Sequence, residues 1–295
     1  MNCQEYRNQF RTNKTVSFTE PYPGIVRLQI VNPLATAEIS LYAGHVMSYA
    51  PVGQTDLLWM SQHSYWEVGK PIRGGIPVCW PWFGAGENGR PAHGLARISP
   101  WSLASVTELP TGETVIVMTL ADTPATRALW DHAFRLELTV SVGKTLQLTL
   151  STTNPETAAF EIAEALHTYF TIGDIARVAI SGFDGCSYLD SLTGKTERQH
   201  GDITFSSETD RAYYDPPAVT TIIDPVLKRQ IANCRGNSTM SVVWNPWIAK
   251  SQRMSDFGDS EYLGMLCMET ANVRDRKISV PAGATHRMTA EIKLV

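Results

Sequence analysis

The sequence has no long apolar run, and it contains few cysteines. No stretch approaches the roughly 20 apolar residues that a membrane-spanning helix needs. The segment from Met1 to Lys14 is polar and lacks the apolar core of a secretory signal. The five cysteines are odd in number and widely spaced, with no C-x-x-C pair, which argues against a disulfide scaffold or a zinc ribbon. We therefore expect a reduced, cytoplasmic protein without a membrane partner.

Basic clusters and several well-known catalytic motifs are missing too. The net charge is −4, and Lys and Arg form no block, which argues against nucleic acid as a partner because backbone binding requires clustered cations. The sequence has no Walker A loop, no G-x-G-x-x-G after a strand, no G-x-S-x-G elbow and no H-E-x-x-H. Any bound anion is therefore expected to be small and held by a few placed arginines. Nothing in the sequence indicates an obligate protein partner.

The chain does contain many short segments that are typical of β-strands. Hydrophobic residues make up 43% and charged residues 18%, which is ordinary for a globular protein with a sizeable core. Gly143-Lys144 predicts a tight turn that joins two of the strands into a hairpin. The predicted strands are Gly24–Val31, Ala37–Tyr42, Thr114–Leu120, Phe134–Val142, Thr145–Thr152, Val178–Ser181, Met240–Trp244, Leu263–Glu269 and Thr289–Val295.

Helical periodicity is scarce, and short helices are predicted only near Ala125–Trp130 and around Pro225–Ile231. The segment Asp184–Asp215 is rich in Asp, Ser, Thr and Gly and is expected to run over the surface. No linker, low-complexity tract or internal repeat divides the chain. We therefore predict an all-β protein whose residues 1–295 form one domain, a large antiparallel β-sandwich of two packed sheets.

His167 is the first candidate for chemistry. If Glu164–Phe170 is a strand, His167 shares one face with Ala165 and Tyr169. A histidine beside a small residue and a tyrosine hydroxyl suits the lining of a site. The alternative is a hydrogen-bonded core histidine. For an isolated histidine in a strand, this alternative is favoured by about two to one.

Glu269 is the second candidate. In the segment Leu263–Thr270 it shares a face with Met265 and Cys267. A carboxylate that ends an apolar strand is unfavourable when buried without a partner, and its pKa rises there unless hydrogen bonds or cations compensate. A side chain that simply reaches solvent at the strand end is equally consistent with this segment.

A long loop between residues 65 and 101 supplies the third set of candidates. It holds four of the eight tryptophans, with Trp59 just upstream, and many Gly and Pro residues; long ordered loops of this kind usually carry function. Arg73 precedes two glycines, and Arg97 lies four residues after His93. Two loop arginines suit a phosphate dianion because each planar guanidinium donates two hydrogen bonds. Surface arginines paired with Asp or Glu are the alternative.

Two further interpretations stay open at this point. A metal site built from His93, His167 and Glu269 is compatible with the residue types, although no short-range ligand pair supports it. The tryptophans of the loop either stack on an apolar face of a ligand or pack in the core.

Four segments together make the pattern specific. They are Arg-Gly-Gly-Ile-Pro-Val-Cys-Trp-Pro-Trp-Phe-Gly at 73–84, His-Gly-Leu-Ala-Arg at 93–97, Leu-His-Thr-Tyr-Phe at 166–170 and Cys-Met-Glu-Thr at 267–270. In order and spacing the chain resembles, from about residue 25 to its end, the hexose-6-phosphate mutarotases, or glucose-6-phosphate 1-epimerases. These belong to the aldose 1-epimerase-like group with a galactose-mutarotase-like β-sandwich. The chain departs from the usual pattern at Leu95, where Phe is common, at Ala43-Gly44, whose order is inverted, and in the polar insert Ala85–Pro91.

The resemblance implies roles for individual residues. His167 matches the catalytic acid and Glu269 the catalytic base of the family. Arg73 and Arg97 match residues that contact the phosphate or the sugar, and His93 matches a substrate-contacting histidine. Asp190 looks like the aspartate that binds sugar hydroxyls.

The resemblance also implies a reaction. It is an isomerase reaction that interconverts the α and β anomers of a hexose 6-phosphate without metal or cofactor, with a small sugar phosphate as the partner. One acid and one base suffice for it, because ring opening needs one proton to leave O1 and another to reach O5. The alternatives are a mutarotase for unphosphorylated sugars, against which Arg73 and Arg97 argue, and a non-catalytic carbohydrate-binding sandwich, against which His167 and Glu269 argue.

Overall fold

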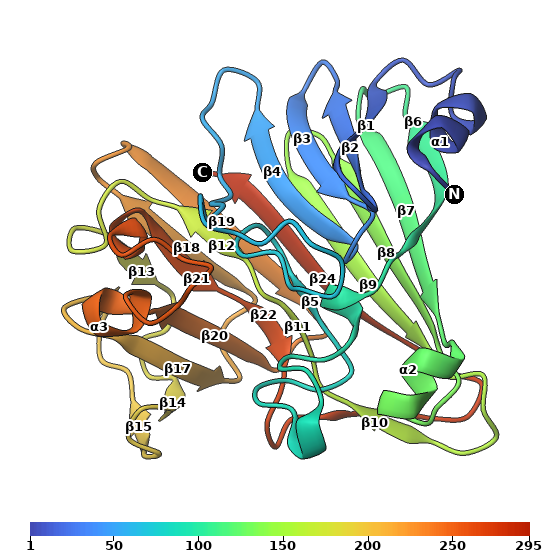
Figure 1. Ribbon diagram of the computed structural model, residues 1–295. Helices are drawn as coiled ribbons and strands as arrows, with labels where there is room; N and C mark the ends of the chain where they lie inside the picture. The colour runs from blue at the N-terminus through green and yellow to red at the C-terminus, as the bar shows by residue number, and fades with distance from the viewer.

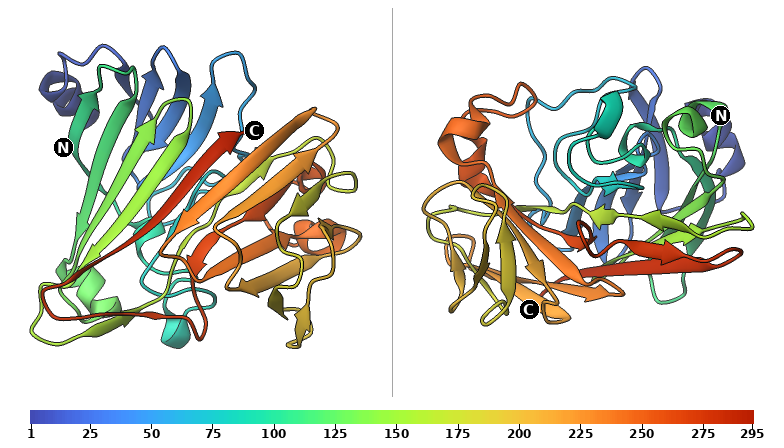
Figure 2. Two further views of the ribbon diagram at one scale, coloured as in Figure 1. Left: turned by 180° about the vertical axis from the view of Figure 1, so that it is seen from behind. Right: turned by 90° about the horizontal axis from the view of Figure 1, so that it is seen from below.

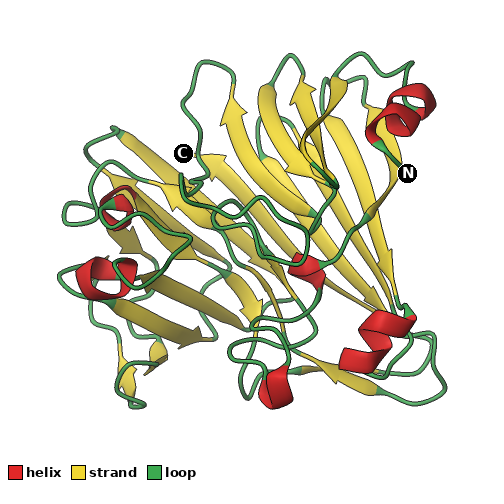
Figure 3. Ribbon diagram, viewed as in Figure 1, coloured by secondary structure: helices red, strands yellow, loops and turns green.

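Antiparallel strands dominate the structure (Figure 3). The computed structural model describes residues 1–295, apart from the side chain of Asn88. The predicted all-β sandwich is confirmed, because the strands form two nine-stranded sheets, one four-stranded sheet and one two-stranded sheet.

One nine-stranded sheet extends through the whole molecule (Figures 1 and 2). Its strand order is β16-β13-β18-β19-β24-β9-β8-β7-β6. Strands β8 and β9 form the predicted hairpin, in which Val142 pairs with Leu146 across the turn. The strands are β6 (Ser102–Glu108), β7 (Thr114–Ala121), β8 (Arg135–Val142), β9 (Leu146–Thr153), β13 (Ala179–Ser181), β16 (Ile203–Thr204), β18 (Val219–Asp224), β19 (Arg229–Gly236) and β24 (Thr285–Leu294).

The four-stranded sheet covers the β6–β9 half of this long sheet, as the blue and green strands of Figure 1 show. It consists of β1 (Val16–Tyr22), β2 (Ile25–Val31), β3 (Ala35–Ser40) and β4 (His45–Pro51). Polar contacts join the two layers at one end: the Asn32 amide donates to the carbonyl of Val142 at 2.9 Å, and the Tyr49 hydroxyl donates to that of Gly143 at 2.9 Å.

The second nine-stranded sheet covers the other half. It runs in the order β15-β14-β17-β20-β22-β11-β5, and β21 and β12 branch from it. Its contact with the long sheet includes Met268, whose carbonyl accepts from the Asn233 amide at 3.4 Å and whose sulfur accepts from the Thr220 hydroxyl at 3.2 Å. The strands are β5 (Val78–Cys79), β11 (Glu164–Leu166), β12 (Tyr169–Thr171), β14 (Ser187–Asp190), β15 (Thr196–Arg198), β17 (Thr209–Tyr214), β20 (Met240–Asn245), β21 (Met265–Met268) and β22 (Thr270–Asn272). The small sheet pairs β10 (Phe160–Ile162) with β23 (Ile278–Val280).

Helices are few and short. They are α1 (Cys3–Gln9), α2 (Pro124–Leu129) and α3 (Trp247–Ser251), with 3₁₀ turns η1 (Glu87–Gly89), η2 (Ala96–Ile98) and η3 (Glu261–Gly264). Helix α2 confirms the helix expected near Ala125–Trp130. No helix that the structure describes has the length and apolar content to cross a bilayer.

Two local predictions are wrong. The helix expected around Pro225–Ile231 is a turn from β18 into β19, because the Asp224 carboxylate accepts the backbone N–H groups of Val226 and Leu227 at 3.0 Å each. Such local side-chain bonds compete with a helix. The segment Asp184–Asp215 is more than a surface loop, because it contains β14 to β17 and buries Tyr213 completely.

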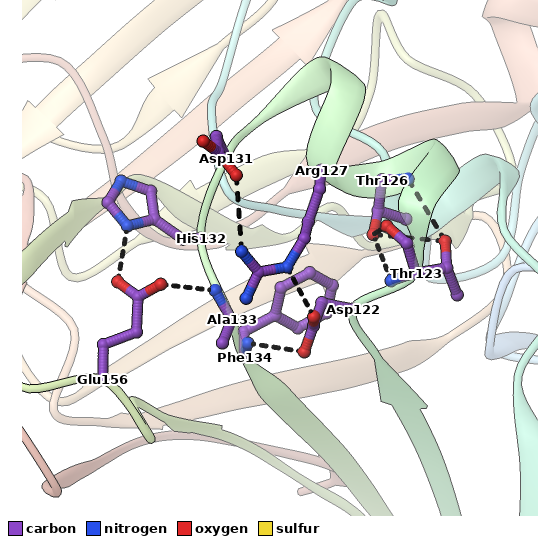
Figure 4. A network of polar contacts seen from close by, with 9 residues as sticks. All are labelled: Asp122, Thr123, Thr126, Arg127, Asp131, His132, Ala133, Phe134 and Glu156. Atoms are coloured by element: carbon purple, nitrogen blue, oxygen red, sulfur yellow. Dashed lines mark hydrogen bonds and ion pairs between the residues drawn. The ribbon is translucent and has the colours of Figure 1, made fainter.

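A polar network fixes the segment that follows α2 (Figure 4). Asp122 accepts from the Arg127 guanidinium at 2.8 Å and from the backbone N–H of Phe134 at 3.2 Å. The Glu156 carboxylate forms a hydrogen bond with the His132 ring at 2.8 Å and accepts from the backbone N–H of Ala133 at 2.7 Å. Trp130 lies in sequence between Arg127 and His132, so these bonds fix the backbone on both sides of it. Trp130 is part of the cavity wall described below.

Candidate functional site

A cavity of about 800 Å³ opens on the outer face of the second nine-stranded sheet, a size typical of small-molecule sites. Strand alternation creates this face. Leu166, Phe170 and Val243 point into the main core of the sandwich, whereas Ala165 and Tyr169 belong to smaller clusters on the opposite side. The cavity wall is completed by the loop of residues 81–93, by Lys250 of α3 and by loop residues near 191, 254 and 274–277.

His167 and Glu269 meet in this cavity, as the sheet register requires. Leu166 pairs with Thr270 on one side of them, and Tyr169 pairs with Cys267 on the other. Both pairs belong to one antiparallel register, in which His167 lies directly opposite Glu269 on the cavity side. The His167 Nε2 atom is 3.2 Å from Oε1 of Glu269.

Neighbouring groups hold the His167 ring in place. Its backbone N–H donates to the carbonyl of Pro77 at 3.0 Å. The Tyr169 ring stacks on the imidazole with centroids 4.8 Å apart and planes inclined by 13°. The His93 ring approaches edge-on at 5.8 Å. The histidine is therefore packed on two sides, and its side chain is only 10% exposed.

Glu269 sits at the junction of β21 and β22 and is almost fully buried. Its backbone is fixed on both sides: the N–H donates to the carbonyl of Val242 at 2.8 Å, and the carbonyl accepts from the Ser241 hydroxyl at 2.7 Å. Within the described part of the chain, Oε2 of Glu269 and Nδ1 of His167 are buried without a hydrogen-bond partner. Unpartnered buried polar atoms are rare and mark atoms that a ligand can satisfy.

Burial sets the proton affinities of the pair in opposite directions. Loss of hydration lowers the pKa of His167 well below its ordinary value, and the neighbouring His93 and Arg97 lower it further. Loss of hydration raises the pKa of Glu269 well above its ordinary value; nearby Asp210 adds to the rise and Arg97 opposes it. His167 is therefore a stronger acid, and Glu269 a stronger base, than either would be in water.

Arg73 and His93 also line the cavity. The Arg73 guanidinium is already bonded: Nε and Nη2 donate to Oδ2 of Asp256 at 3.1 and 2.9 Å, and Nη1 donates to the Tyr169 hydroxyl at 2.9 Å. His93 packs edge-on against Phe83 at 4.6 Å, and burial lowers its pKa to about 3, with help from the charges of Arg97 and Arg73.

The loop geometry around His93 depends on glycine. Gly94 has φ of +84°, and a Cβ atom there would lie 2.0 Å from the carbonyl oxygen of Trp80. Only glycine permits this approach. The close packing fixes His93 on the cavity wall and buries Trp80 in the core behind it.

The structure does not bring Arg97 and Asp190 to the cavity wall. Arg97 is buried behind it, where Nη2 donates to the carbonyl of Ala92 at 2.9 Å. Asp190 ends β14, and its Oδ1 accepts the backbone N–H groups of Leu192 and Thr193 at 2.8 and 3.1 Å, which stabilises a turn. Its carboxylate is thus engaged away from the cavity.

Several wall residues were missed by the sequence reasoning. Asp210 on β17 accepts from the Ser191 hydroxyl at 2.8 Å, and both residues line the cavity. No local signal distinguishes Asp210, because it lies in a polar stretch and reaches the cavity only through the pairing of β17 with β20. Among the tryptophans of the long loop, Trp82 lines the cavity, whereas Trp66 stacks on Tyr22 elsewhere.

The structure also bears on the metal hypothesis. His93, His167 and Glu269 all line the cavity. Over the residues that the structure describes, no group of three or more His, Cys, Asp or Glu side chains is arranged to hold a metal ion.

The sequence and the fold were compared with those of known proteins. A candidate glucose-6-phosphate 1-epimerase from Escherichia coli K12 is 39% identical over 243 residues, which cover 81% of this chain and 81% of that protein. Another from Cenchrus ciliaris is 36% identical over 261 residues, covering 85% and 79%. The crystal structure of a candidate mutarotase from Salmonella typhimurium superposes with a TM-score of 0.90 at 31% identity and covers 99% of both chains. The family model described as aldose 1-epimerase matches residues 26–293. The resemblance inferred from the sequence is confirmed, and the chain belongs to the aldose 1-epimerase family.

Proposed function

We propose that this protein interconverts the α and β anomers of a hexose 6-phosphate, with His167 and Glu269 as the proton-transfer pair. The observation that carries the proposal is the buried contact of 3.2 Å between the two side chains in the wall of a sugar-sized cavity. The names of the curated relatives point to the same substrate class.

The reaction consists of two proton transfers that open the sugar ring and the reverse transfers that close it. Glu269 removes the proton from O1 of the sugar, and the O1–H electron pair becomes the second bond of the C1=O1 carbonyl. The C1–O5 bond breaks, and O5 takes the proton that His167 gives. Rotation about C1–C2 turns the aldehyde, and ring closure on the other face returns each proton by the reverse route. An acid and a base placed in this way each contribute about 10² to 10⁴ in rate.

The environment of the pair favours the opening step. A histidine with a lowered pKa gives its proton to O5 more readily, and a carboxylate with a raised pKa takes the O1 proton more readily. Ring opening also converts an imidazolium–carboxylate pair into two neutral groups. Neutral groups are the forms that a buried site stabilises, so proton transfer to and from the sugar is assisted in the direction of the aldehyde.

Other wall residues suit recognition of a sugar. Asp210 is a carboxylate acceptor for hydroxyl groups, and Trp82 and Trp244 present aromatic surface to the cavity. Arg73 keeps two N–H groups beyond the three that Asp256 and Tyr169 use, and it has donors for an oxygen of the sugar. Orientation at such remote points supports the reacting end of the substrate.

Exchange NMR on glucose 6-phosphate tests the proposal. The wild-type protein should accelerate exchange between the anomers, and Glu269→Gln should reduce the catalysed rate by at least about 10²-fold. Glu137, an exposed carboxylate on β8 that does not line the cavity, supplies the control, and Glu137→Gln should keep the wild-type rate. Anomer exchange by Glu269→Gln at the wild-type rate would contradict the mechanism. Equal activity on glucose and glucose 6-phosphate would favour a mutarotase for unphosphorylated sugars.

A further inference from the structure

Five Lys and Arg side chains line the cavity, and they fall into two groups. Arg73 pairs with Asp256 at 2.9 Å, and Lys250 pairs with Glu208 at 3.0 Å. The other three cations, which are Arg90, Arg274 and Lys277, form no ion pair with an acidic side chain in the described part of the chain. We call these three the rim cations, because all are exposed at the mouth of the cavity.

The rim cations sit on two segments of the cavity wall, and one of these segments continues from Glu269. Arg274 and Lys277 belong to the loop between β22 and β23, and β22 begins immediately after Glu269. Arg90 lies just before His93 on the loop that forms another part of the wall. A ligand that places its reacting carbon at Glu269 therefore has cations within the same cavity for a second, anionic group.

Arg274 is exposed, but its side chain contacts a residue of the cavity wall. Its backbone adopts φ of +58°, an uncommon conformation for a residue other than glycine. Its Nη2 atom donates to the Ser191 hydroxyl at 2.7 Å, and Ser191 itself lines the cavity. Ser191 in turn donates to the Asp210 carboxylate at 2.8 Å, so Arg274 reaches this carboxylate through a hydroxyl and forms no direct ion pair with it.

The two arginines first considered for a phosphate are less suited to it. The charge of Arg73 is offset by Asp256, and three of its five N–H groups are in use. Arg97 lies behind the wall and contacts a backbone carbonyl. A phosphate dianion needs charge that no internal carboxylate neutralises, and planar guanidinium donors supply it best.

We propose that Arg274 and Lys277, with Arg90 completing the rim, bind the phosphate group of the hexose 6-phosphate and set the preference for phosphorylated over free sugar. This inference rests on the proposed function.

The same loop contains a matched control. Arg276 lies between Arg274 and Lys277 in sequence, but it pairs with Asp215 at 2.9 Å and does not line the cavity. Arg276→Ala therefore removes a similar charge from the same loop without touching the proposed phosphate end.

The test compares KM and kcat for glucose 6-phosphate and for glucose in the wild type, Arg274→Ala/Lys277→Ala and Arg276→Ala. The double variant should raise KM for glucose 6-phosphate by about tenfold or more, since a hydrogen bond to a charged group is worth at least that factor. Its kcat/KM for glucose and the KM of Arg276→Ala should stay within about twofold of wild type. Arg274→Lys should recover part of the loss, because it restores charge without the planar fork.

The two proposals fail in different ways. If the wild type exchanges glucose 6-phosphate anomers and the double variant keeps the KM of Arg276→Ala, the rim is not the phosphate site, while the proposed function stands. If the double variant loses activity equally on both sugars, its effect is not specific to phosphate, and the inference is overturned. If the wild type does not accelerate anomer exchange, the proposed function falls and this inference falls with it.

Discussion

Arg73 donates two hydrogen bonds to a single oxygen of Asp256, from Nε at 3.1 Å and from Nη2 at 2.9 Å. Both side chains are largely buried. The third contact of Arg73, to the Tyr169 hydroxyl, links this ion pair to the ring that stacks on His167. Asp256 therefore controls how strongly the charge of Arg73 acts on His167.

Asp256→Asn tests this control. The variant keeps the volume of the side chain but leaves the buried Arg73 charge without its counter-charge. The positive potential at His167 rises, so the acid limb of the pH–rate profile should move to lower pH, because Arg73 already lowers the pKa of His167. The free energy of unfolding should fall by about 3 kcal/mol, as for a buried pair that loses one partner. Denaturant unfolding and a pH–rate profile measure the two effects.

Asp215→Asn serves as its control. Asp215 pairs with Arg276 at the same distance of 2.9 Å, but its side chain is 63% exposed. Removal of an exposed partner should change stability by less than about 1 kcal/mol and leave the pH profile unchanged. Similar losses in both variants would show that the Arg73–Asp256 pair has no special role.

The pH dependence of catalysis follows from the proton count of the His167–Glu269 pair. The proposed mechanism requires one proton on the pair, so activity should fall where the pair gains a second proton and where it loses its only one. Since the pKa of His167 is lowered, the acid limb should lie below the ordinary histidine value of about 6.5. Since the pKa of Glu269 is raised, the alkaline limb should lie well above that of an ordinary carboxyl group. An acid limb with its midpoint at about 6.5 would contradict the assignment.

His45 should make the fold sensitive to acid. It is fully buried, with Nε2 donating to the carbonyl of Gly74 at 2.8 Å. Burial lowers its pKa to about 4, and Arg97 contributes, although the bond to Gly74 opposes the shift. Below about pH 6.5 His45 is therefore protonated in the unfolded chain but stays neutral in the folded chain. The free energy of unfolding decreases as pH falls.

The size of this effect is measurable. The pKa difference corresponds to about 3 kcal/mol lost between pH 6.5 and pH 4. Urea unfolding at pH 7.5 and pH 5.0 should show the decrease in the wild type and a smaller decrease in His45→Asn. An unchanged pH dependence in that variant would show that His45 is not the group responsible.

The sequence predicted those parts of the site that depend on local periodicity. Strand alternation put His167 and Tyr169 on one face, and the stacked rings agree, although the predicted strand Glu164–Phe170 is interrupted at residues 167–168, between β11 and β12. It could not predict that His167 lies opposite Glu269, because that register depends on pairing between β12 and β21, which are far apart in the chain. The family resemblance supplied this juxtaposition in advance, and the geometry gives its physical reason.

Two kinds of contact explain the predictions that were wrong. A side chain bonded to the backbone in place of a helical hydrogen bond, or a residue was paired with a partner far away in the sequence. The segment after Asp224 was compatible with a helix, but the Asp224 carboxylate accepts two of its backbone N–H groups and forms a turn instead. Arg73 looked like an available phosphate ligand because nothing in its own segment indicates that it pairs with Asp256. Sequence reasoning predicted the strands near His167 and Glu269 and missed the long-range polar partners.

Asp190 and Asp210 offer a final discriminating experiment, because the resemblance pointed to the first and the cavity contains the second. Asp210→Asn removes a charge that raises the pKa of Glu269, and it replaces a carboxylate acceptor in the wall by an amide. Its kcat/KM on glucose 6-phosphate should fall by about tenfold to 10²-fold, in line with a lost charged hydrogen bond, and the alkaline limb of its pH profile should move to lower pH.

Asp190→Asn should behave differently, since an asparagine side chain can also accept the two backbone N–H groups that fix the turn after β14. Its kcat/KM and pH profile should match those of the wild type. A larger loss in Asp190→Asn than in Asp210→Asn would place the sugar hydroxyls on the β14 side and contradict the cavity described for this site. Because both substitutions are isosteric and both aspartates lie in the same sheet, the ranking of the two variants separates a contact with substrate from an effect on the fold.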